Sequence, residues 1–365
     1  MAQRGLFFTG AGGFLGRFIL SHYLRREDTD LFLLENGAFC ERLRAFVDAS
    51  APDASQRARV RILEGDITKP DLGLSAPLRE ELKDRVTHAI HLAALYNLSA
   101  PRDISVRVNV DGTRNLLDFL GSLKHLQKFA HTSTLAVAGK YSGVFTEDDF
   151  DKGQSFKNFY EETKFLSEKL VRERRDSIPT VIFRPAAVVG HSKTGEIEKI
   201  DGPYYAFITI ARYMHLVLPD CGVVKCHIAP VDFVTDGFHA LFEDDASVGN
   251  VYFLMDPRPL TYNAFFDLAC EHWGRIKPIL RLPPWLIKPV MQLGPVAKLT
   301  GIPWKAFMYG DQPIEYNIEK STAALAKHGI ACPTVASYID VMIRYFREHY
   351  HDSNVRRENW WVARK

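Results

Sequence analysis

The residues best suited to chemistry are a tyrosine and a lysine four positions apart, Tyr160 and Lys164. The surrounding residues follow a helical period, so both side chains fall on one face of the predicted helix. A phenol with a reference pKa of about 10 is a poor acid–base group at neutral pH, and a neighbouring ammonium lowers that pKa. Thr134 follows a predicted strand and offers a hydroxyl to a substrate carbonyl oxygen. We therefore expect Thr134, Tyr160 and Lys164 to be catalytic.

A glycine-rich segment near the N-terminus is a candidate anion-binding turn. Thr9 to Gly16 reads Thr-Gly-Ala-Gly-Gly-Phe-Leu-Gly and separates a predicted strand from a predicted helix. Gly10 allows a sharp turn, Gly13 lets the backbone approach a pyrophosphate, and Gly16 lets the helix pack closely on the strand. The helix N-terminus directs free N–H groups at the anion. Such a turn also occurs without a ligand, so the motif needs its context.

Three strand ends supply that context. Glu35 ends the second predicted strand, where a carboxylate accepts hydrogen bonds from the adenosine ribose and repels a 2′-phosphate. This favours NAD over NADP, unless Glu35 is only a solvated surface residue. Asp66 is expected to meet the adenine amino group, and His91 is interpreted as a packed strand-end histidine. The expected cofactor-binding residues are Gly10, Gly13, Phe14, Leu15, Gly16, Glu35, Asp66, Ile67, Leu92, Ala93, Ala94, Asn109, Tyr160, Lys164, Pro185 and Val188.

Short apolar runs alternate with helical patterns through the N-terminal half, which indicates a parallel sheet covered on both faces. The predicted strands are 6–8, 31–34, 60–63, 89–93, 128–131 and 180–184, and the predicted helices 14–25, 109–123 and 156–174. Right-handed crossovers make this an α/β fold with a doubly wound Rossmann-type sheet. We expect residues 1–190, completed by about 222–256, to form the NAD(P)-binding domain. Residues 191–221 and 257–365 are expected to form a smaller, mainly helical C-terminal substrate-binding domain.

The segment from Leu282 to Trp304 carries five prolines among apolar residues and cannot be one continuous helix. It includes Trp285 and Met291, and it suggests a hydrophobic lid or channel over the site. The alternatives are the core of the smaller domain or a contact with a membrane surface. Helical patterns return at 322–328 and 335–349.

Composition narrows the class of protein. The 365 residues are 46% apolar and 25% charged, as in an ordinary soluble globular protein, and a net charge of +2 argues against nucleic acid as a partner. Five cysteines without a C-x-x-C pair suggest the reduced thiols of a cytoplasmic protein rather than disulfides or a metal site. No apolar run suggests a transmembrane segment or a signal peptide. The oligomeric state, including a homodimer, stays open.

Taken together, these motifs resemble the extended short-chain dehydrogenase/reductases over nearly the whole chain. The resemblance rests on the glycine-rich turn, His91 to Ala94, Asn109 to Thr113, Ser133-Thr134, Tyr160 with Lys164, and Arg184-Pro185. It implies a Thr/Ser–Tyr–Lys catalytic set, here Thr134, Tyr160 and Lys164. It also implies a nicotinamide cofactor bound across the sheet.

A narrower resemblance is to the thioester reductase and fatty acyl-CoA reductase branch, and it rests on residues 65–75, 184–196, 201–205 and 230–234. It implies NAD(P)-dependent reduction of an acyl thioester, as acyl-CoA or bound to a carrier protein, to an aldehyde or alcohol. Two features differ from that branch. Glu35 stands where an arginine for NADPH is common, and the adenylation and carrier domains often fused to such reductases are not in the sequence. We therefore expect the thioester to arrive in trans.

The alternative is an NAD-dependent dehydrogenase or ketoreductase acting on a secondary alcohol or ketone of a hydrophobic lipid-, steroid- or polyketide-like substrate. Glu35 favours this alternative, because NAD suits oxidation in cells, whereas the long motifs favour the thioester. Nucleotide-sugar epimerisation and a non-enzymatic NAD-binding scaffold are weaker alternatives. The intact set of Thr134, Tyr160 and Lys164 argues against a scaffold.

Overall fold

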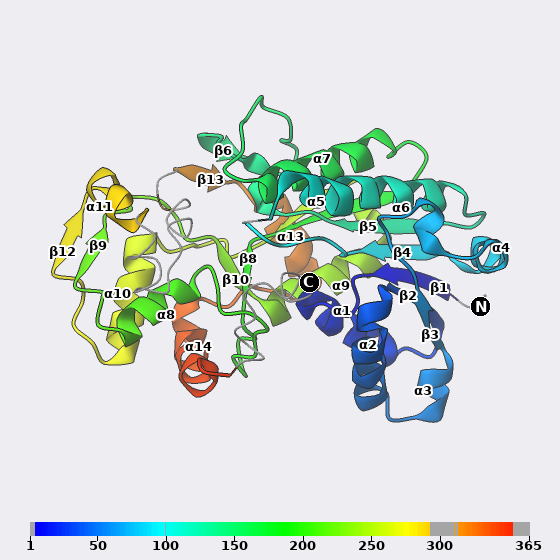
Figure 1. Cartoon of the computed structure of the whole chain (residues 1–365), viewed down its shortest axis with the longest axis horizontal. Helices are drawn as coiled ribbons and strands as arrows, with labels where there is room; N and C mark the ends of the chain where they lie inside the picture. Colours follow the sequence, from blue (N-terminus) through cyan, green and yellow to red (C-terminus); the bar gives the residue numbers. More distant parts are fainter. Residues whose placement is uncertain (1–3, 99, 293–309, 311–312, 353–365) are drawn as a thin grey trace.

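The computed structural model describes residues 4–98, 100–292, 310 and 313–352. Its centre is a seven-stranded sheet in the order β11-β7-β5-β4-β1-β2-β3, with every neighbouring pair parallel (Figure 1). The strands are β1 (Arg4–Thr9), β2 (Thr29–Glu35), β3 (Val60–Glu64), β4 (His88–His91), β5 (Lys128–Thr132), β7 (Thr180–Pro185) and β11 (Val251–Leu254). From β1 the chain first winds toward β3 and then returns through β4 toward β11. The predicted doubly wound Rossmann-type α/β fold is therefore confirmed.

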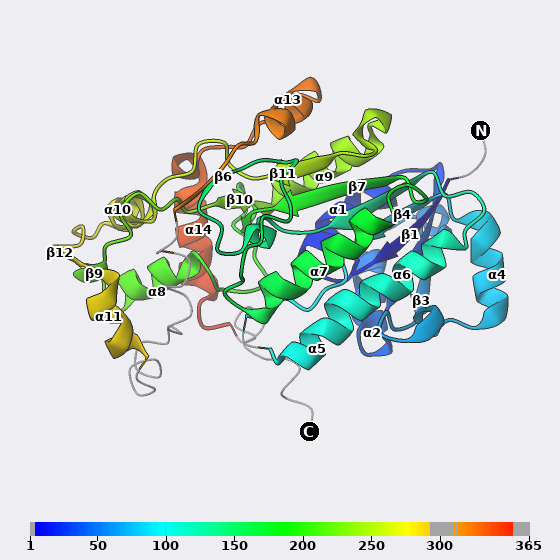
Figure 2. The same ribbon diagram turned by 90° about the horizontal axis from the view of Figure 1, so that it is seen from above.

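Apolar side chains alternate between the two faces of the sheet along β1, so both faces need helices to cover them. Leu6 and Phe8 pack with α1 (Phe14–Leu24) and α9 (Val231–Glu243), whereas Phe7 packs in a second cluster with α6 (Gly112–Gly121). All three side chains are fully buried, as expected of a parallel strand. The first cluster also takes residues of α2 (Gly37–Ser50), and the second takes residues of α4 (Ala76–Arg85) and α7 (Phe159–Glu173). Figure 2 shows α6 and α7 on one side of the strands and α9 on the other.

A separate hydrophobic core lies beyond the carboxyl ends of the strands (Figure 1). It is built by α8 (Tyr204–Ala211), α10 (Tyr262–Trp273) and α14 (Val335–His349), whose rings meet around Phe207. By contrast, α13 (Glu319–Lys327) packs through Leu325 against the core of the large sheet. The remaining elements are α3 (Ala54–Ala58), α5 (Arg102–Val106), α11 (Pro284–Met291), and the strand pairs β8 (Ala187–Val189) with β10 (Ile228–Pro230), β9 (Val217–Pro219) with β12 (Leu280–Leu282) and β6 (Gly143–Phe145) with β13 (Ile314–Tyr316).

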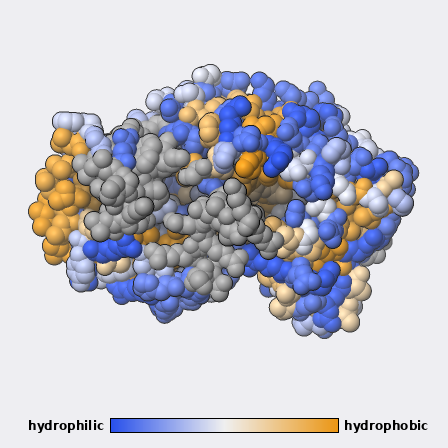
Figure 3. Space-filling model, viewed as in Figure 1, coloured by the Kyte–Doolittle hydropathy of each residue, from blue (hydrophilic) through white to orange (hydrophobic). Residues whose placement is uncertain are grey.

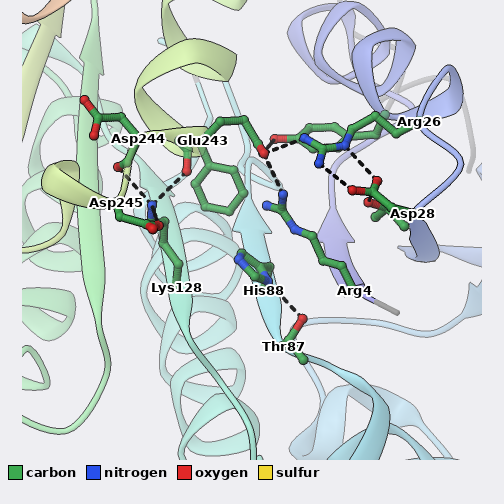
Figure 4. A network of polar contacts seen from close by, with 12 residues as sticks. Arg4, Arg26, Asp28, Thr87, His88, Lys128, Glu243, Asp244 and Asp245 are labelled. Atoms are coloured by element: carbon green, nitrogen blue, oxygen red, sulfur yellow. Dashed lines mark hydrogen bonds and ion pairs between the residues drawn. The ribbon is translucent and has the colours of Figure 1, made fainter. Parts of the chain in front are cut away.

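The amino edge of the sheet is fastened by a polar network around Glu243 (Figure 4). The carboxylate of Glu243 accepts hydrogen bonds from Arg4 on β1, at 2.7 Å, from Arg26, and from Tyr23 on α1, at 3.0 Å. Nearby, the buried ammonium of Lys128 donates to the carbonyl oxygens of Phe242 and Asp244. These contacts hold the end of α9 against the starts of β1 and β5. The opposite, carboxyl edge carries the predicted site residues.

Two helix starts differ from the sequence expectation. The helix expected from residue 156 begins at Phe159, because the side chain of Asn158 accepts the N–H of Glu161 at 3.0 Å and caps it. The helix expected from residue 109 begins earlier, at Arg102, and continues through a π-helical turn, Arg107–Asp111, before α6. Asn109 therefore lies within a helix rather than at its start.

The apolar segment that begins at Leu282 lies partly outside the described residues, which include neither residues 293–304 nor the side chain of Met291. In the described part, Trp285 is 70% exposed and Leu286 is 44% exposed. Figure 3 shows hydrophobic atoms gathered at the same end of the molecule. These two side chains are therefore not part of a buried core. Within the described ranges, no helix has the length and hydropathy needed to cross a bilayer.

Candidate active site

The predicted site residues gather where the parallel strands end. Gly10 follows β1, Glu35 ends β2, Ala93 follows β4 and Thr134 follows β5. β1 and β4 are the neighbours at which the winding of the chain reverses. In open α/β sheets, ligands bind in the crevice at such a switch point.

The glycine-rich turn has the geometry of a pyrophosphate cradle. Gly10 has φ +79°, and a Cβ there would lie 2.5 Å from the backbone nitrogen of Ala93. A Cβ on Gly16 would lie 2.1 Å from the carbonyl oxygen of Gly10, so this glycine lets α1 pack on the turn. No hydrogen-bond partner is found in the described part of the chain for the N–H groups of Phe14 and Leu15, which open α1. The residues present therefore fit a bound pyrophosphate.

Glu35 faces this turn. Its Oε2 lies 2.8 Å from where a Cβ on Gly12 would stand, and its Oε1 accepts the N–H of Asn36 at 3.0 Å. Burial raises the pKa of this carboxyl, and the backbone hydrogen bonds from Asn36 and Gly12 oppose that rise. Gly12 is a contact that the sequence interpretation missed. The carboxylate thus lies against the second glycine of the turn, beside the expected place of an adenosine ribose.

Next to Glu35, a pocket of about 610 Å³ opens between the ends of β2 and β3. Its lining residues are Asn36, Gly37, Ala38, Glu64, Gly65, Asp66, Lys69 and Gly73. Oδ1 of Asp66 accepts the N–H and the hydroxyl of Thr68, at 2.8 and 2.7 Å, and so shapes the turn after β3. Ile67 is buried, and a Cβ on Gly112 would lie 2.8 Å from the Cδ1 atom of Ile67. An adenine contact through Asp66 stays a prediction.

The three expected catalytic residues are brought together at the end of β5. The side chain of Thr134 lies near enough to Tyr160 to act on the phenol pKa, and the Thr134 hydroxyl accepts the N–H of Ala136 at 3.2 Å. Lys164 lies one turn further along α7, where its Nζ donates to the carbonyl oxygen of Thr132 at 2.7 Å. Thr134 and Lys164 are buried, whereas Tyr160 keeps some exposed surface. Tyr160 is therefore the member of the set that a substrate can reach.

The electrostatics of this set differ from the sequence expectation. Desolvation raises the pKa of Tyr160 to about 12, although the nearby Thr134 side chain opposes the rise. Desolvation lowers the pKa of Lys164 to about 8, and the charge of Glu168 opposes that fall. The ammonium points to the Thr132 carbonyl, so the expected lowering of the phenol pKa by Lys164 is not seen. At neutral pH the phenol is protonated, which suits it to donate a proton.

Asn109 supports the catalytic helix through backbone and side-chain hydrogen bonds. Its Oδ1 accepts the N–H of Leu95 at 2.7 Å, and its Nδ2 donates to the carbonyl oxygen of Leu95 at 3.3 Å. Nδ2 also donates to the hydroxyl of Thr163 at 3.0 Å, on the α7 turn between Tyr160 and Lys164. Asn109 thus joins the chain after β4 to the catalytic helix. These contacts suit a positioning residue, and its expected cofactor contact stays a prediction.

The other predicted residues fall around the same edge. Ala93 and Ala94 follow β4, and the N–H of Leu92 donates to the carbonyl oxygen of Thr9 at 3.0 Å. Pro185 ends β7, and Val188 lies on β8 beyond it. His91 is buried, with Nδ1 2.7 Å from the Thr9 hydroxyl and Nε2 3.2 Å from that of Thr113. Burial lowers the pKa of His91 to about 3, consistent with a packed, neutral histidine.

Sequence reasoning missed Tyr96. Its ring meets the Tyr160 ring edge-on, with centroids 5.1 Å apart, and it is 48% exposed. The Nζ of Lys199, from the segment before α8, lies 5.3 Å from the centroid of the Tyr96 ring. Its position in the sequence, just after Ala93 and Ala94 at the end of β4, could have indicated that Tyr96 lies at the site. Tyr96 and Lys199 stand at the open side of the catalytic tyrosine.

Glu168 was also missed as a member of the site. It is fully buried one turn after Lys164, and its Oε2 accepts the hydroxyl of Ser133 at 2.5 Å and Nε of Arg184 at 3.1 Å. Ser133 directly precedes Thr134. In the sequence, Arg184 stands out only as part of an Arg-Pro motif. Its spacing from Glu168 does not indicate a contact between the two residues.

Comparison with known proteins places these features in a family. A family model of NAD-binding proteins, described as male sterility protein, matches residues 8–238. Fatty acyl-CoA reductase wat of Drosophila melanogaster is 26% identical over 277 residues, which cover 65% of this chain and 54% of that protein. Carboxylic acid reductase of Mycobacterium marinum is 26% identical over 322 residues, which cover 78% of this chain and 27% of that protein.

The chain thus spans about half the length of the first of these relatives and about a quarter of the second. Among solved structures, the terminal R domain from the myxalamid PKS-NRPS biosynthetic pathway superimposes with a TM-score of 0.82. It is 24% identical, and the match covers 97% of this chain and 93% of that one. At this identity the likeness shows a shared fold.

Proposed function

Since the chain belongs to the male sterility protein family of NAD-binding proteins, we propose that it reduces acyl thioesters to aldehydes with a nicotinamide cofactor. The names of two relatives support the substrate class, because one is a fatty acyl-CoA reductase and the other a carboxylic acid reductase. The observation that carries the proposal is the placement of the Thr134 side chain beside a protonated Tyr160. Two hydroxyl donors at one point suit a reaction that develops negative charge on a carbonyl oxygen.

The proposed reaction follows from these two donors. When bound, the nicotinamide supplies a hydride to the thioester carbonyl carbon. The carbonyl electron pair moves to oxygen, where the hydroxyls of Thr134 and Tyr160 stabilise the oxyanion and Tyr160 donates its proton. The thiohemiacetal then loses its C–S bond, so one thiol and one aldehyde leave for each hydride consumed. A second hydride would convert the aldehyde to an alcohol.

Lys164 has a binding role in this proposal. Its ammonium is held by the Thr132 carbonyl, directly beside the strand end that carries Thr134. Its remaining N–H donors are available to the hydroxyls of the nicotinamide ribose.

We propose NAD as the preferred cofactor. Glu35 supports this, because its carboxylate faces the ribose side of the glycine turn and would repel a 2′-phosphate. The charge of Arg42 acts on Glu35 and would attract such a phosphate. However, the Arg42 guanidinium forms an ion pair with Glu198, which also lies 3.7 Å from Arg17. Glu198 therefore neutralises this cation.

The substrate is proposed to arrive in trans, as an acyl-CoA or as an acyl group on a carrier protein. We assign its binding to residues 191–221 and 257–365, because the core of α8, α10 and α14 adjoins the carboxyl edge of the sheet. Lys199, which belongs to that part, lies over the Tyr96 ring, and Tyr96 contacts Tyr160, so both side chains would contact an incoming thioester. We also propose a cytoplasmic location, which the five free cysteine thiols support.

A substrate panel tests the proposed function. The purified chain is mixed with NADH or NADPH and with acyl-CoAs of several chain lengths, and the nicotinamide absorbance and the released thiol are followed together. We expect loss of reduced cofactor matched by release of thiol. Turnover of secondary alcohols or ketones without activity on any thioester would favour the alternative dehydrogenase.

A further inference from the structure

The pocket beside Glu35 contains a second carboxylate that the cofactor motif does not use. Glu64 is the last residue of β3 and the register partner of Glu35 on β2. Its exposed side chain lines the pocket together with Asn36, Gly37 and Ala38, which begin α2. Among the residues that the structure describes, no hydrogen bond or ion pair is found for this carboxylate. Its charge is therefore directed into the pocket without compensation.

The carboxylate of Glu64 stands at the first turn of α2. A Cβ on Gly37 would lie 2.4 Å from Oε1 of Glu64, so the glycine provides the space for that oxygen. Burial raises the pKa of the Cys40 thiol, which also lies in the first turn of α2. The charges of Glu35 and Glu64 raise this pKa further. The two carboxylates therefore approach the start of α2 from two adjacent strands. A helix start of this kind otherwise attracts an anion.

We infer that Glu64 is a specificity-determining residue that excludes the 2′-phosphate of NADP from the start of α2. The inference rests on the proposed NAD-dependent function and deepens it. The Asn36 side chain already accepts the N–H of Ala38, but the N–H of Gly37, for which no partner is found among the described residues, and the dipole of α2 would otherwise stabilise a phosphate attached to the adenosine ribose. With Glu64 in place, the phosphate meets a like charge at that point, and Lys69 is the one cation in the lining of the pocket.

Glu35 and Glu64 then have different roles, which makes the inference testable. Glu35 lies against the glycine turn and would accept hydrogen bonds from the ribose hydroxyls of either cofactor. Its loss should weaken NADH as well as admit NADPH. Glu64 lies over α2 and only repels the phosphate, so its loss should affect NADPH alone.

The experiment measures binding without a substrate. Wild type, Glu64→Gln and Glu35→Gln are titrated with NADH and NADPH, and the cofactor fluorescence is followed at low and high salt. For Glu64→Gln, we expect the Kd for NADPH to fall about tenfold at low salt, while the Kd for NADH changes less than about twofold. The gain should shrink at high salt, because the pocket is open to solvent. Glu41→Gln, which removes an exposed carboxylate on α2 that does not line the pocket, is the matched control.

Two outcomes would overturn the inference in distinguishable ways. If wild type prefers NADH but Glu64→Gln and Glu41→Gln both leave the NADPH Kd unchanged, Glu64 has no role in selection and Glu35 alone carries the preference. If wild type binds NADPH more tightly than NADH, the proposed cofactor preference is itself wrong, and the inference about Glu64 falls with it. Because Glu64 is exposed, its substitution leaves the buried core untouched.

Discussion

Glu168 and Arg184 form an ion pair with 2.7 Å between Oε1 and Nη2, and neither side chain has any exposed surface. Glu168 lies on the catalytic helix α7, and Arg184 lies on β7. The guanidinium also donates to the carbonyl oxygen of Asp149 at 2.9 Å. The pair thus fastens the helix that carries Tyr160 and Lys164 to the sheet. Through Ser133, it also holds the segment that carries Thr134.

Glu168→Gln should destabilise the protein strongly, because it leaves the Arg184 charge buried without a partner. We expect a loss of roughly 3–5 kcal/mol in the free energy of unfolding, measured by urea denaturation. Glu162→Gln, on the same helix, breaks an ion pair in which the Arg102 side chain is 55% exposed. Its expected loss is below about 1 kcal/mol. Equal losses in the two variants would show that the buried pair has no special role.

The same pair predicts a dependence of stability on acid. Although burial alone raises it, the Arg184 charge and hydrogen bonds hold the pKa of Glu168 at about 2. The folded pKa is thus below the unfolded value of about 4.3. The stabilisation is complete above the unfolded pKa and is lost as the pH falls toward the folded one. Unfolding free energies measured across this acid range should show the loss in wild type and a smaller one in Glu168→Gln.

For Lys164, we expect stability and activity to change in opposite directions as the pH rises. Its folded pKa of about 8 lies below the unfolded value, because burial disfavours the ammonium. The unfolded chain therefore binds more protons, and stability should rise as the pH increases from about 8 to 10. Catalysis that needs the ammonium should decline over the same range. Lys164→Met should remove this rise in stability with pH and abolish turnover. A rise that persists in the variant would assign it to another group.

Asn109→Ala should lower turnover without weakening cofactor binding, because Asn109 holds Leu95 and Thr163 rather than the cofactor. Misplacement of α7 by a fraction of an ångström is expected to reduce kcat by about tenfold to a hundredfold. Thr163→Val removes the contact with Asn109 from the side of α7, together with the hydrogen bonds that the Thr163 hydroxyl donates to the carbonyl oxygens of Phe159 and Tyr160, and should cause a smaller part of the loss. Cofactor fluorescence titrations check the binding. A large increase in the Kd for NADH would instead make Asn109 a cofactor contact.

The sequence was sufficient for six of the seven strands of the central sheet and for the glycine turn, since these depend on continuous apolar runs and local backbone demands, but β11 was not predicted. It also predicted the branch of the family, and the male sterility protein match and the two relatives confirm it. The start of the helix at Arg102 was missed, because a π-helical turn adds a residue and interrupts the apolar period between α5 and α6.

Features that depend on tertiary contacts could not be predicted. The direction of the Lys164 ammonium is set by the carbonyl of Thr132, and the phenol pKa of Tyr160 is set by burial. The partnership of Glu168 with Arg184 joins a helix to a strand, so no periodicity reveals it. Local spacing can place Tyr160 and Lys164 on one helical face, but it cannot show what each side chain contacts.

Tyr160→Phe should separate chemistry from binding. The variant keeps the ring, including its edge contact with Tyr96, and loses only the hydroxyl. We expect turnover to fall by roughly two to four orders of magnitude, the range for loss of a general acid, while the Kd for NADH stays unchanged. Stopped-flow measurement of NADH oxidation with a saturating acyl-CoA gives the rate. Near-normal turnover would remove Tyr160 from the mechanism.

The most direct test of the central claim follows the hydride itself. The protein is incubated with an acyl-CoA and with NADH that carries deuterium at the transferred position of C4. Mass spectrometry then locates the label, and a thiol reagent counts the released CoA. The account predicts deuterium on the former carbonyl carbon of the aldehyde or alcohol, with one thiol released for the first hydride transferred. Oxidation of NADH without thiol release, or with label absent from that carbon, would contradict thioester reduction by this chain.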